Sequence, residues 1–197
     1  RDPKPLKAES IEEIKIGNLT WMQGNLNVEY FQNGDLIPEI TDDAEWQKTK
    51  SAAWCYVNND STGQGDLGRL YNYYAITDPR GLLPAGWHVA MAEDWDSLRS
   101  YLVGQEDTNA RSSLFCQDFA DTISNEKMYL GFKFPQSNSR KPDGVFLRDR
   151  GYVHFWVNPR STGRGNHVFV RLEMNVIDFN RKSEPLNSGF AVRCVKD

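Results

Sequence analysis

Long apolar runs are missing from this sequence. No stretch approaches the roughly 18 consecutive apolar residues that a membrane-spanning helix requires, and the mean hydropathy is -0.63. Hydrophobic residues still make up 39% of the 197 residues, and aromatic residues 12%. The chain is therefore long enough for one globular domain with a hydrophobic core, and too short for two comfortable ones.

Metal-ligating residues are also few. The only cysteines are Cys55, Cys116 and Cys194, which are far apart and form no C-x-x-C pair, and the three histidines do not cluster with them. A structural zinc site is not expected from this spacing. Two alternatives stay open at this point, namely one disulfide with a leftover thiol or three buried free thiols.

The common catalytic motifs are absent. The sequence contains no G-x-S-x-G, no H-E-x-x-H and no P-loop. Three carboxylates, Glu93, Asp94 and Asp96, lie together, but they fall in the first turn of a predicted helix, where acidic side chains favour the helix dipole. We therefore expect no enzymatic activity.

The net charge of -4 is unevenly distributed. Residues 1–132 hold 11 basic and 21 acidic side chains, whereas residues 133–197 hold 12 basic and 6 acidic ones. The overall acidity argues against general nucleic-acid binding. The basic C-terminal third indicates either a surface for an anionic ligand or a solvated face that balances an acidic one.

Periodicity predicts short helices followed by a series of strands, which is typical of an α+β domain. Alternation around Gly17 predicts a hairpin over 14–22. Acidic first turns predict a helix from about 41 to 50 and a second over 93–102, and the apolar segment 70–76 fits helix or strand. Buried strands are expected at 53–57 and, after residue 131, at 132–134, 145–147, 152–157, 168–172, 176–179 and 190–195.

Three blocks in this order resemble the Fibrobacter succinogenes major paralogous domain family. The first is Ile16-Gly17-Asn18-Leu19-Thr20-Trp21-Met22-Gln23-Gly24-Asn25-Leu26-Asn27. The second runs from Gly68-Arg69-Leu70-Tyr71-Asn72 through Asp78-Pro79-Arg80-Gly81 to Gly86-Trp87-His88-Val89. The third is Asn187-Ser188-Gly189-Phe190-Ala191-Val192-Arg193-Cys194-Val195. The resemblance implies a single domain over 14–197, and the polar, Pro-containing start of the chain predicts a linker or tether over 1–13.

The family is similar to the C-type-lectin-like fold, in the branch of the formylglycine-generating enzyme. The resemblance implies two helices packed on a short, twisted, mostly antiparallel sheet with long loops. It also implies a protein of Bacteroidetes-type bacteria that is secreted or held at the outer cell surface, with a lipid anchor upstream of Arg1. By the same resemblance, a disulfide would join Cys55 to Cys194, and Cys116 would be the odd thiol.

On lectin-like folds, ligands usually contact the loops before the last strands. Those loops are 158–167 and 180–187, with two aromatic residues nearby, and they equally fit plain soluble hairpin tips. Aromatic, Arg and Asn side chains suit sugar or peptide recognition. The expected ligand contacts are Tyr152, Trp156, Arg160, Arg164, Asn166 and Arg181.

The oxidase chemistry of the formylglycine branch uses a pair of nearby cysteines, which this chain lacks. The favoured function is therefore recognition or adhesion, with a glycan or a surface protein as partner. A structural subunit of a surface assembly is the alternative, and an inactive relative of the enzyme comes third.

No cofactor is expected. The segment Glu184-Pro185-Leu186-Asn187 superficially resembles the calcium-dependent sugar motif of C-type lectins, but it has one residue too many and no Trp-Asn-Asp partner. Loop oxygens of Asn58, Asn59, Asp60 and Asp66 are of the kind that bind calcium, although a solvated polar loop explains them equally well.

Overall fold

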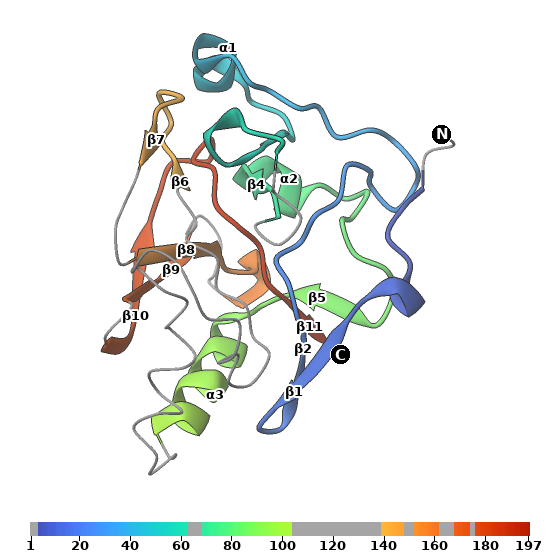
Figure 1. Cartoon of the computed structure of the whole chain (residues 1–197), viewed down its shortest axis with the longest axis vertical. Coiled ribbons are helices and arrows are strands. Elements are labelled where there is room, and N and C mark those ends of the chain that lie inside the picture. Colours follow the sequence, from blue (N-terminus) through green and yellow to red (C-terminus); the bar gives the residue numbers. More distant parts are fainter. Residues whose placement is uncertain (1–3, 63–67, 104–138, 148–151, 162–167, 174–175) are drawn as a thin grey trace.

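The computed structural model describes residues 4–62, 68–103, 139–147, 152–161, 168–173 and 176–197. Within them the chain is an α+β domain with small antiparallel sheets and few helices, as the sequence predicted (Figure 1). One helix more than the expected two is present. The helices are α1 (Asp43–Lys48), α2 (Tyr73–Thr77), α3 (Ala92–Val103) and the 3-10 turns η1 (Ala8–Ser10), η2 (Val57–Asn59) and η3 (Pro159–Ser161).

The largest described sheet joins the two ends of the chain. Its strand order is β1-β2-β11-β5, with β1 and β2 from the start of the domain and β11 from its end. Figure 1 shows β11 beside β2 and β5. Its strands are β1 (Glu13–Ile16), β2 (Leu19–Met22), β5 (Trp87–Val89) and β11 (Cys194–Lys196).

A second sheet has the order β10-β9-β8, and two short pairs, β3 with β4 and β6 with β7, complete the described strands. All of these pairs are antiparallel. The strands are β3 (Trp54–Cys55), β4 (Leu70–Tyr71), β6 (Ser139–Arg140), β7 (Phe146–Leu147), β8 (Tyr152–Trp156), β9 (Val168–Glu173) and β10 (Val176–Ser183).

Local signals explain several element boundaries. Gly17 has φ +59° at the turn of the first hairpin, a conformation that glycine adopts without strain. The Asp42 side chain accepts from the Glu45 amide and begins α1, and the Asn72 side chain does the same for the Ala75 amide of α2. The ambiguous segment 70–76 proves to be both, a two-residue strand followed by a short helix.

The core consists of two clusters of buried side chains. Trp21 and Trp95 lie in one of them with ring centroids 5.2 Å apart, which fixes α3 against the first hairpin. The buried side chains, each at most 7% exposed, include Trp21, Leu26, Trp54, Tyr71, Trp87, Trp95, Leu98, Phe169 and Phe190.

The segment expected to be a linker lies against the domain in its described part. Leu6 and Ile11 pack against a core cluster, and the side-chain amide of Gln32 donates to the carbonyl of Leu6 at 3.3 Å. The backbone amide of Gln23 donates to Glu12 at 2.8 Å. These residues therefore belong to the folded unit.

Candidate functional site

The three sequence blocks that carry the resemblance meet in space, and their polar side chains stabilise the fold. The Leu26 amide of the first block donates to Val192 of the third, at 2.9 Å. Tyr71 of the second block exchanges two backbone hydrogen bonds with Phe190 of the third. Arg193 is fully buried and donates to the carbonyls of Met22 and Gln23. Burial lowers its pKa to about 9.

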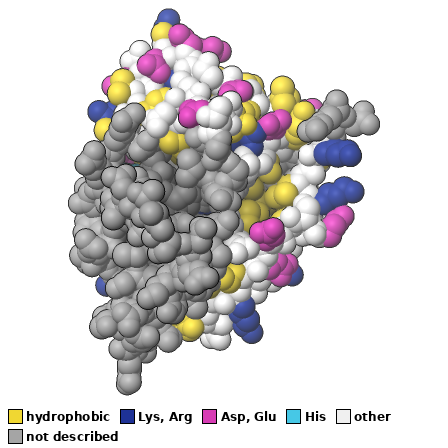
Figure 2. All heavy atoms as spheres, in the orientation of Figure 1, with side chains coloured by type: hydrophobic (Ala, Val, Ile, Leu, Met, Phe, Trp, Pro, Cys, Tyr) yellow, Lys and Arg dark blue, Asp and Glu magenta, His cyan; other side chains and the backbone are white. Residues whose placement is uncertain are grey.

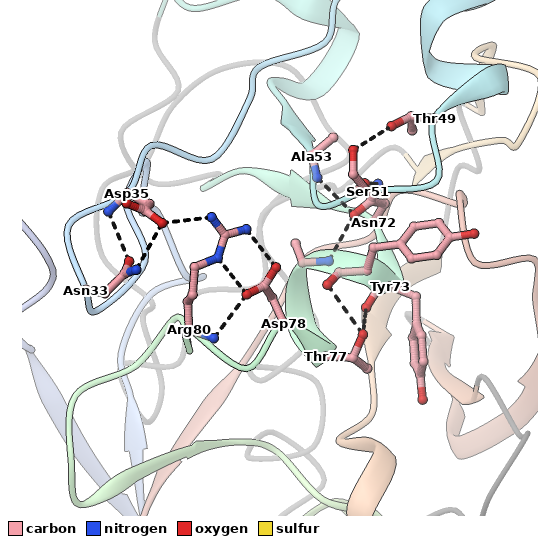
Figure 3. Close-up of polar contacts among 12 residues, drawn as sticks. Asn33, Asp35, Thr49, Ser51, Ala53, Asn72, Tyr73, Thr77, Asp78 and Arg80 are labelled. Carbon is pink, nitrogen blue, oxygen red and sulfur yellow. Dashed lines mark hydrogen bonds and ion pairs between the residues drawn. The ribbon is translucent and has the colours of Figure 1, made fainter.

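The polar residues of the second block are likewise held by the scaffold (Figure 3). The guanidinium of Arg80 binds the carboxylates of Asp78 and Asp35 at 2.8 and 3.0 Å. Hydrogen bonds from Asn33 and from Arg80 hold the pKa of Asp35 below its usual value. Asn72 accepts from the Ala53 amide and donates to the carbonyl of Ser51. These polar residues of the second block therefore make structural contacts.

A small pocket lies where the β6–β7 hairpin meets β8, β9 and the segment before the last strand. Its volume is about 170 Å³. The backbones of Arg140 and Gly189 exchange two hydrogen bonds, of 2.9 and 2.7 Å, and these fasten the hairpin to that segment. The lining residues are Ser139, Arg140, Lys141, Pro142, Leu147, His154, Phe169, Glu184, Ser188 and Phe190.

Arg140 anchors the hairpin that forms one wall of this pocket. Its side chain is fully buried and donates to the carbonyls of Ile40, Thr41 and Gly144 and to the carboxylate of Asp43. The turn also requires Gly144, which has φ +91°, because a Cβ there would lie 2.6 Å from the Cα of Asp43. With its donors engaged in this way, Arg140 supports the pocket and is not a ligand contact.

The floor of the pocket is aromatic. His154 stacks on Phe190 at 5.4 Å, and Phe169 stacks on Phe190 at 4.8 Å. All three side chains are buried. This platform is rigid because its members pack on one another and on Trp156, whose ring lies 4.6 Å from that of Phe190.

Three polar side chains of the pocket lack hydrogen-bond or ion-pair partners in the described part of the protein. Ser188 is 1% exposed, and its hydroxyl has no hydrogen-bond partner among the described residues. Lys141 and Glu184 lie at the half-buried rim, and neither takes part in an ion pair within the described part of the chain. A buried hydroxyl without a partner loses its hydration on folding, so a ligand that binds it recovers that loss.

Only part of the predicted site lies in the described residues. Trp156 was expected to contact a ligand, and its side chain is fully buried, with its indole donating to the carbonyl of Tyr71 at 2.7 Å. Arg160 is exposed in η3. Tyr152 and Arg181 occupy positions in β8 and β10, and their side chains are not among those described. Arg164 and Asn166 lie outside the described residues.

The pocket was missed from the sequence for identifiable reasons. Glu184 falls in the loop 180–187 that was expected to bind ligand, and Ser188 falls in the third block. The sequence analysis had therefore already singled out the segments that hold these two residues. Lys141, however, comes from the stretch 105–150, which carries no block of the resemblance, and long-range contacts such as the Arg140–Gly189 pairing bring it to the site.

The structure does not contain the expected disulfide between Cys55 and Cys194, and both residues are buried free thiols in it. Each belongs to a different core cluster, Cys55 on β3 and Cys194 on β11. Burial raises the pKa of Cys55 to about 12 and raises that of Cys194 as well. Cys116 lies outside the described residues.

The polar loop considered for calcium is organised by internal hydrogen bonds. The carboxylate of Asp60 accepts from the amide and the hydroxyl of Thr62, and the side-chain amide of Asn59 donates to Thr41. Asp66 lies outside the described residues. Within the described ranges, no three His, Cys, Asp or Glu side chains gather as metal ligands would, and no helix has the length and apolarity to cross a bilayer.

One further cluster connects the end of the chain to α3. The ring of His88 on β5 bonds Asp94 through Nε2 at 2.9 Å and Asp197 through Nδ1 at 2.6 Å. The hydrogen bond with Asp94 is the main reason that the pKa of His88 is raised. The same Asp94 carboxylate accepts from the Met91 amide, so it also caps the helix.

Residues 14–196 match the model of the family described as the Fibrobacter succinogenes major domain. No curated protein and no solved structure matches the chain.

Proposed function

Taking as premise that this chain belongs to the Fibrobacter succinogenes major domain family, we propose that it is a non-enzymatic recognition module. It has a C-type-lectin-like fold and acts outside the cell, secreted or lipid-anchored at the surface, where it binds a glycan or a surface protein. The pairing of β2 with β11 supports this fold, since it closes the ends of the domain together and leaves the segments between them to present a ligand site.

The observation that carries the proposal is the pocket between the β6–β7 hairpin and the segment 184–190. It combines a rigid aromatic floor with Ser188, Lys141 and Glu184, which are not engaged by the described part of the fold. A concave site with a few convergent polar groups is the usual form of a binding site. By contrast, Asn72, Arg80 and Arg193 of the same three blocks are engaged by the scaffold.

Binding and location can be tested separately. Fluorescently labelled protein is applied to a glycan array and to immobilised envelope proteins, with wild type compared against Lys141→Ala, Glu184→Gln and the exposed control Lys15→Ala on β1. We expect the two pocket variants to lose signal and the control to keep it. If the pocket variants retain every signal, ligands bind elsewhere.

Location is tested by adding a protease to intact cells that produce the full-length protein. Digestion of the domain is expected for a surface module. Protection until the cells are lysed would contradict the extracellular assignment, and chemical turnover of a bound ligand would contradict the non-enzymatic one.

A further inference from the structure

The pocket can be assigned a ligand class from its charges. We propose that it binds one uncharged, hydroxyl-rich group, namely a single sugar unit of a glycan, directly through Ser188, Lys141 and Glu184. This inference rests on the proposed function and names the ligand of that same site.

The balance of charge at the rim is the first argument. Lys141 and Glu184 bring opposite charges to one small pocket, and neither has an ion-pair partner among the described residues. A ligand with a single charge would be attracted by one and repelled by the other. Neighbouring hydroxyls avoid this conflict, because each can accept from an ammonium group and donate to a carboxylate.

The aromatic floor and the volume of the pocket supply the second argument. A volume of about 170 Å³ suits a single ring rather than an extended chain. Phe169 and Phe190 provide an apolar surface for the C–H groups of such a ring. The hydroxyl of Ser188, a residue that lines the pocket, is buried without a described partner, and a ring hydroxyl that reaches it would supply both a donor and an acceptor.

The rim is already in place before the ligand arrives. The side-chain amide of Asn187 donates to the carbonyls of Gln47 and Pro142, so the segment before Ser188 is tied both to α1 and to the hairpin turn. Together with the Arg140–Gly189 backbone pair, these bonds fix the spacing across the pocket. A fixed rim reduces the ordering cost of binding.

The test uses the full chain and uncharged methyl glycosides of glucose, galactose, mannose and xylose, measured by saturation-transfer NMR and calorimetry. Glycine and succinate serve as a zwitterionic and an anionic probe. We expect at least one glycoside to bind, and Lys141→Ala and Glu184→Gln each to weaken it about fivefold or more, as the loss of a hydrogen bond to a charged group does. The affinity of the control Lys15→Ala, at an exposed position on β1, should not change.

The variant Ser188→Ala distinguishes the loss of a ligand contact from the loss of folding. Since this substitution removes a buried hydroxyl with no described partner, the melting temperature should stay the same or rise, while glycoside binding weakens. A lower melting temperature with unchanged affinity would overturn the ligand role of Ser188.

The outcomes also separate this inference from the proposed function. If glycine or succinate binds the pocket and no glycoside does, or if only an envelope protein binds in a manner that depends on Lys141 and Glu184, the sugar assignment is wrong and the recognition function stands. If neither pocket variant alters the binding of any ligand, both are wrong.

Discussion

The hydroxyl of Tyr71 makes two hydrogen bonds with the backbone of Val28, accepting from its amide at 2.7 Å and donating to its carbonyl at 2.8 Å. This side chain takes the place of a neighbouring strand, since it satisfies both the amide and the carbonyl of one buried residue. Tyr71 is fully buried and lies on β4, which Figure 1 shows next to α2. Burial raises the pKa of this phenol, so it stays protonated and keeps its donor.

Tyr71→Phe should therefore be costly. The substitution leaves the amide and the carbonyl of Val28 without a partner in the core, and we expect the free energy of unfolding to fall by about 2–4 kcal/mol. Urea denaturation followed by tryptophan fluorescence measures the change. Tyr74→Phe is the matched control, because Tyr74 is only half-buried, and its cost should be below about 0.5 kcal/mol. Equal costs would contradict the role assigned to the Tyr71 hydroxyl.

His88 should make stability depend on pH. Because Asp94 and Asp197 raise its folded-state pKa above the ordinary value of about 6.5, the protonated ring stabilises the folded state. This contribution is fully present below about pH 6.5 and is lost as the pH rises through the folded pKa. Melting temperatures of wild type and His88→Asn, measured between pH 5 and 9, should converge at the alkaline end. Parallel curves would rule out this linkage.

Arg140 should be indispensable, in contrast to an exposed arginine. Arg140→Lys removes the planar fork that binds three carbonyls and Asp43 and that lies over the ring of Trp46 at 4.5 Å. We expect a loss of about 3–5 kcal/mol in urea denaturation. Arg160→Ala, at an exposed position in η3, should change stability by less than about 0.5 kcal/mol. A tolerated Arg140→Lys would show that the hairpin is held by its backbone pairs alone.

The two buried cysteines should be unreactive in the native protein. With the pKa of Cys55 at about 12 and that of Cys194 also raised, almost no thiolate forms at neutral pH. Iodoacetamide should label the peptides that hold Cys55 and Cys194 only after unfolding in guanidinium, without any reductant. Recovery of the two peptides joined by a Cys55–Cys194 disulfide would show that the bridge implied by the resemblance does form. Native labelling would contradict the burial instead.

The surface view shows how the described side chains divide between core and solvent. In Figure 2 several acidic side chains lie together near the top of the described face, basic and acidic side chains neighbour one another at its right edge, and hydrophobic atoms lie between these groups. Leu36 and Val145, at 60% and 50%, are the exposed large hydrophobic residues of the described chain. Neither lines the pocket.

Elements governed by neighbouring residues were predictable from the sequence. The first hairpin depends on the turn at Gly17, α1 on the cap of Asp42 and α3 on its apolar face with Trp95. These are interactions over a few residues, and hydrophobic patterning reports them directly. The site was harder, because the aromatic residues of β8 give no sign of which face meets solvent. His154, Phe155 and Trp156 are all buried, since the strand is covered on both sides.

Local patterning by itself determined the α+β class, and the three sequence blocks determined the family of this protein. The tertiary structure alone decided that Lys141, Glu184 and Ser188 share one pocket, because residues 139–140 pair with the segment near 189 over almost fifty positions of chain. It also decided that Cys55 and Cys194 lie in separate core clusters. Such pairings depend on the packing of whole segments against one another, and no short-range pattern encodes them.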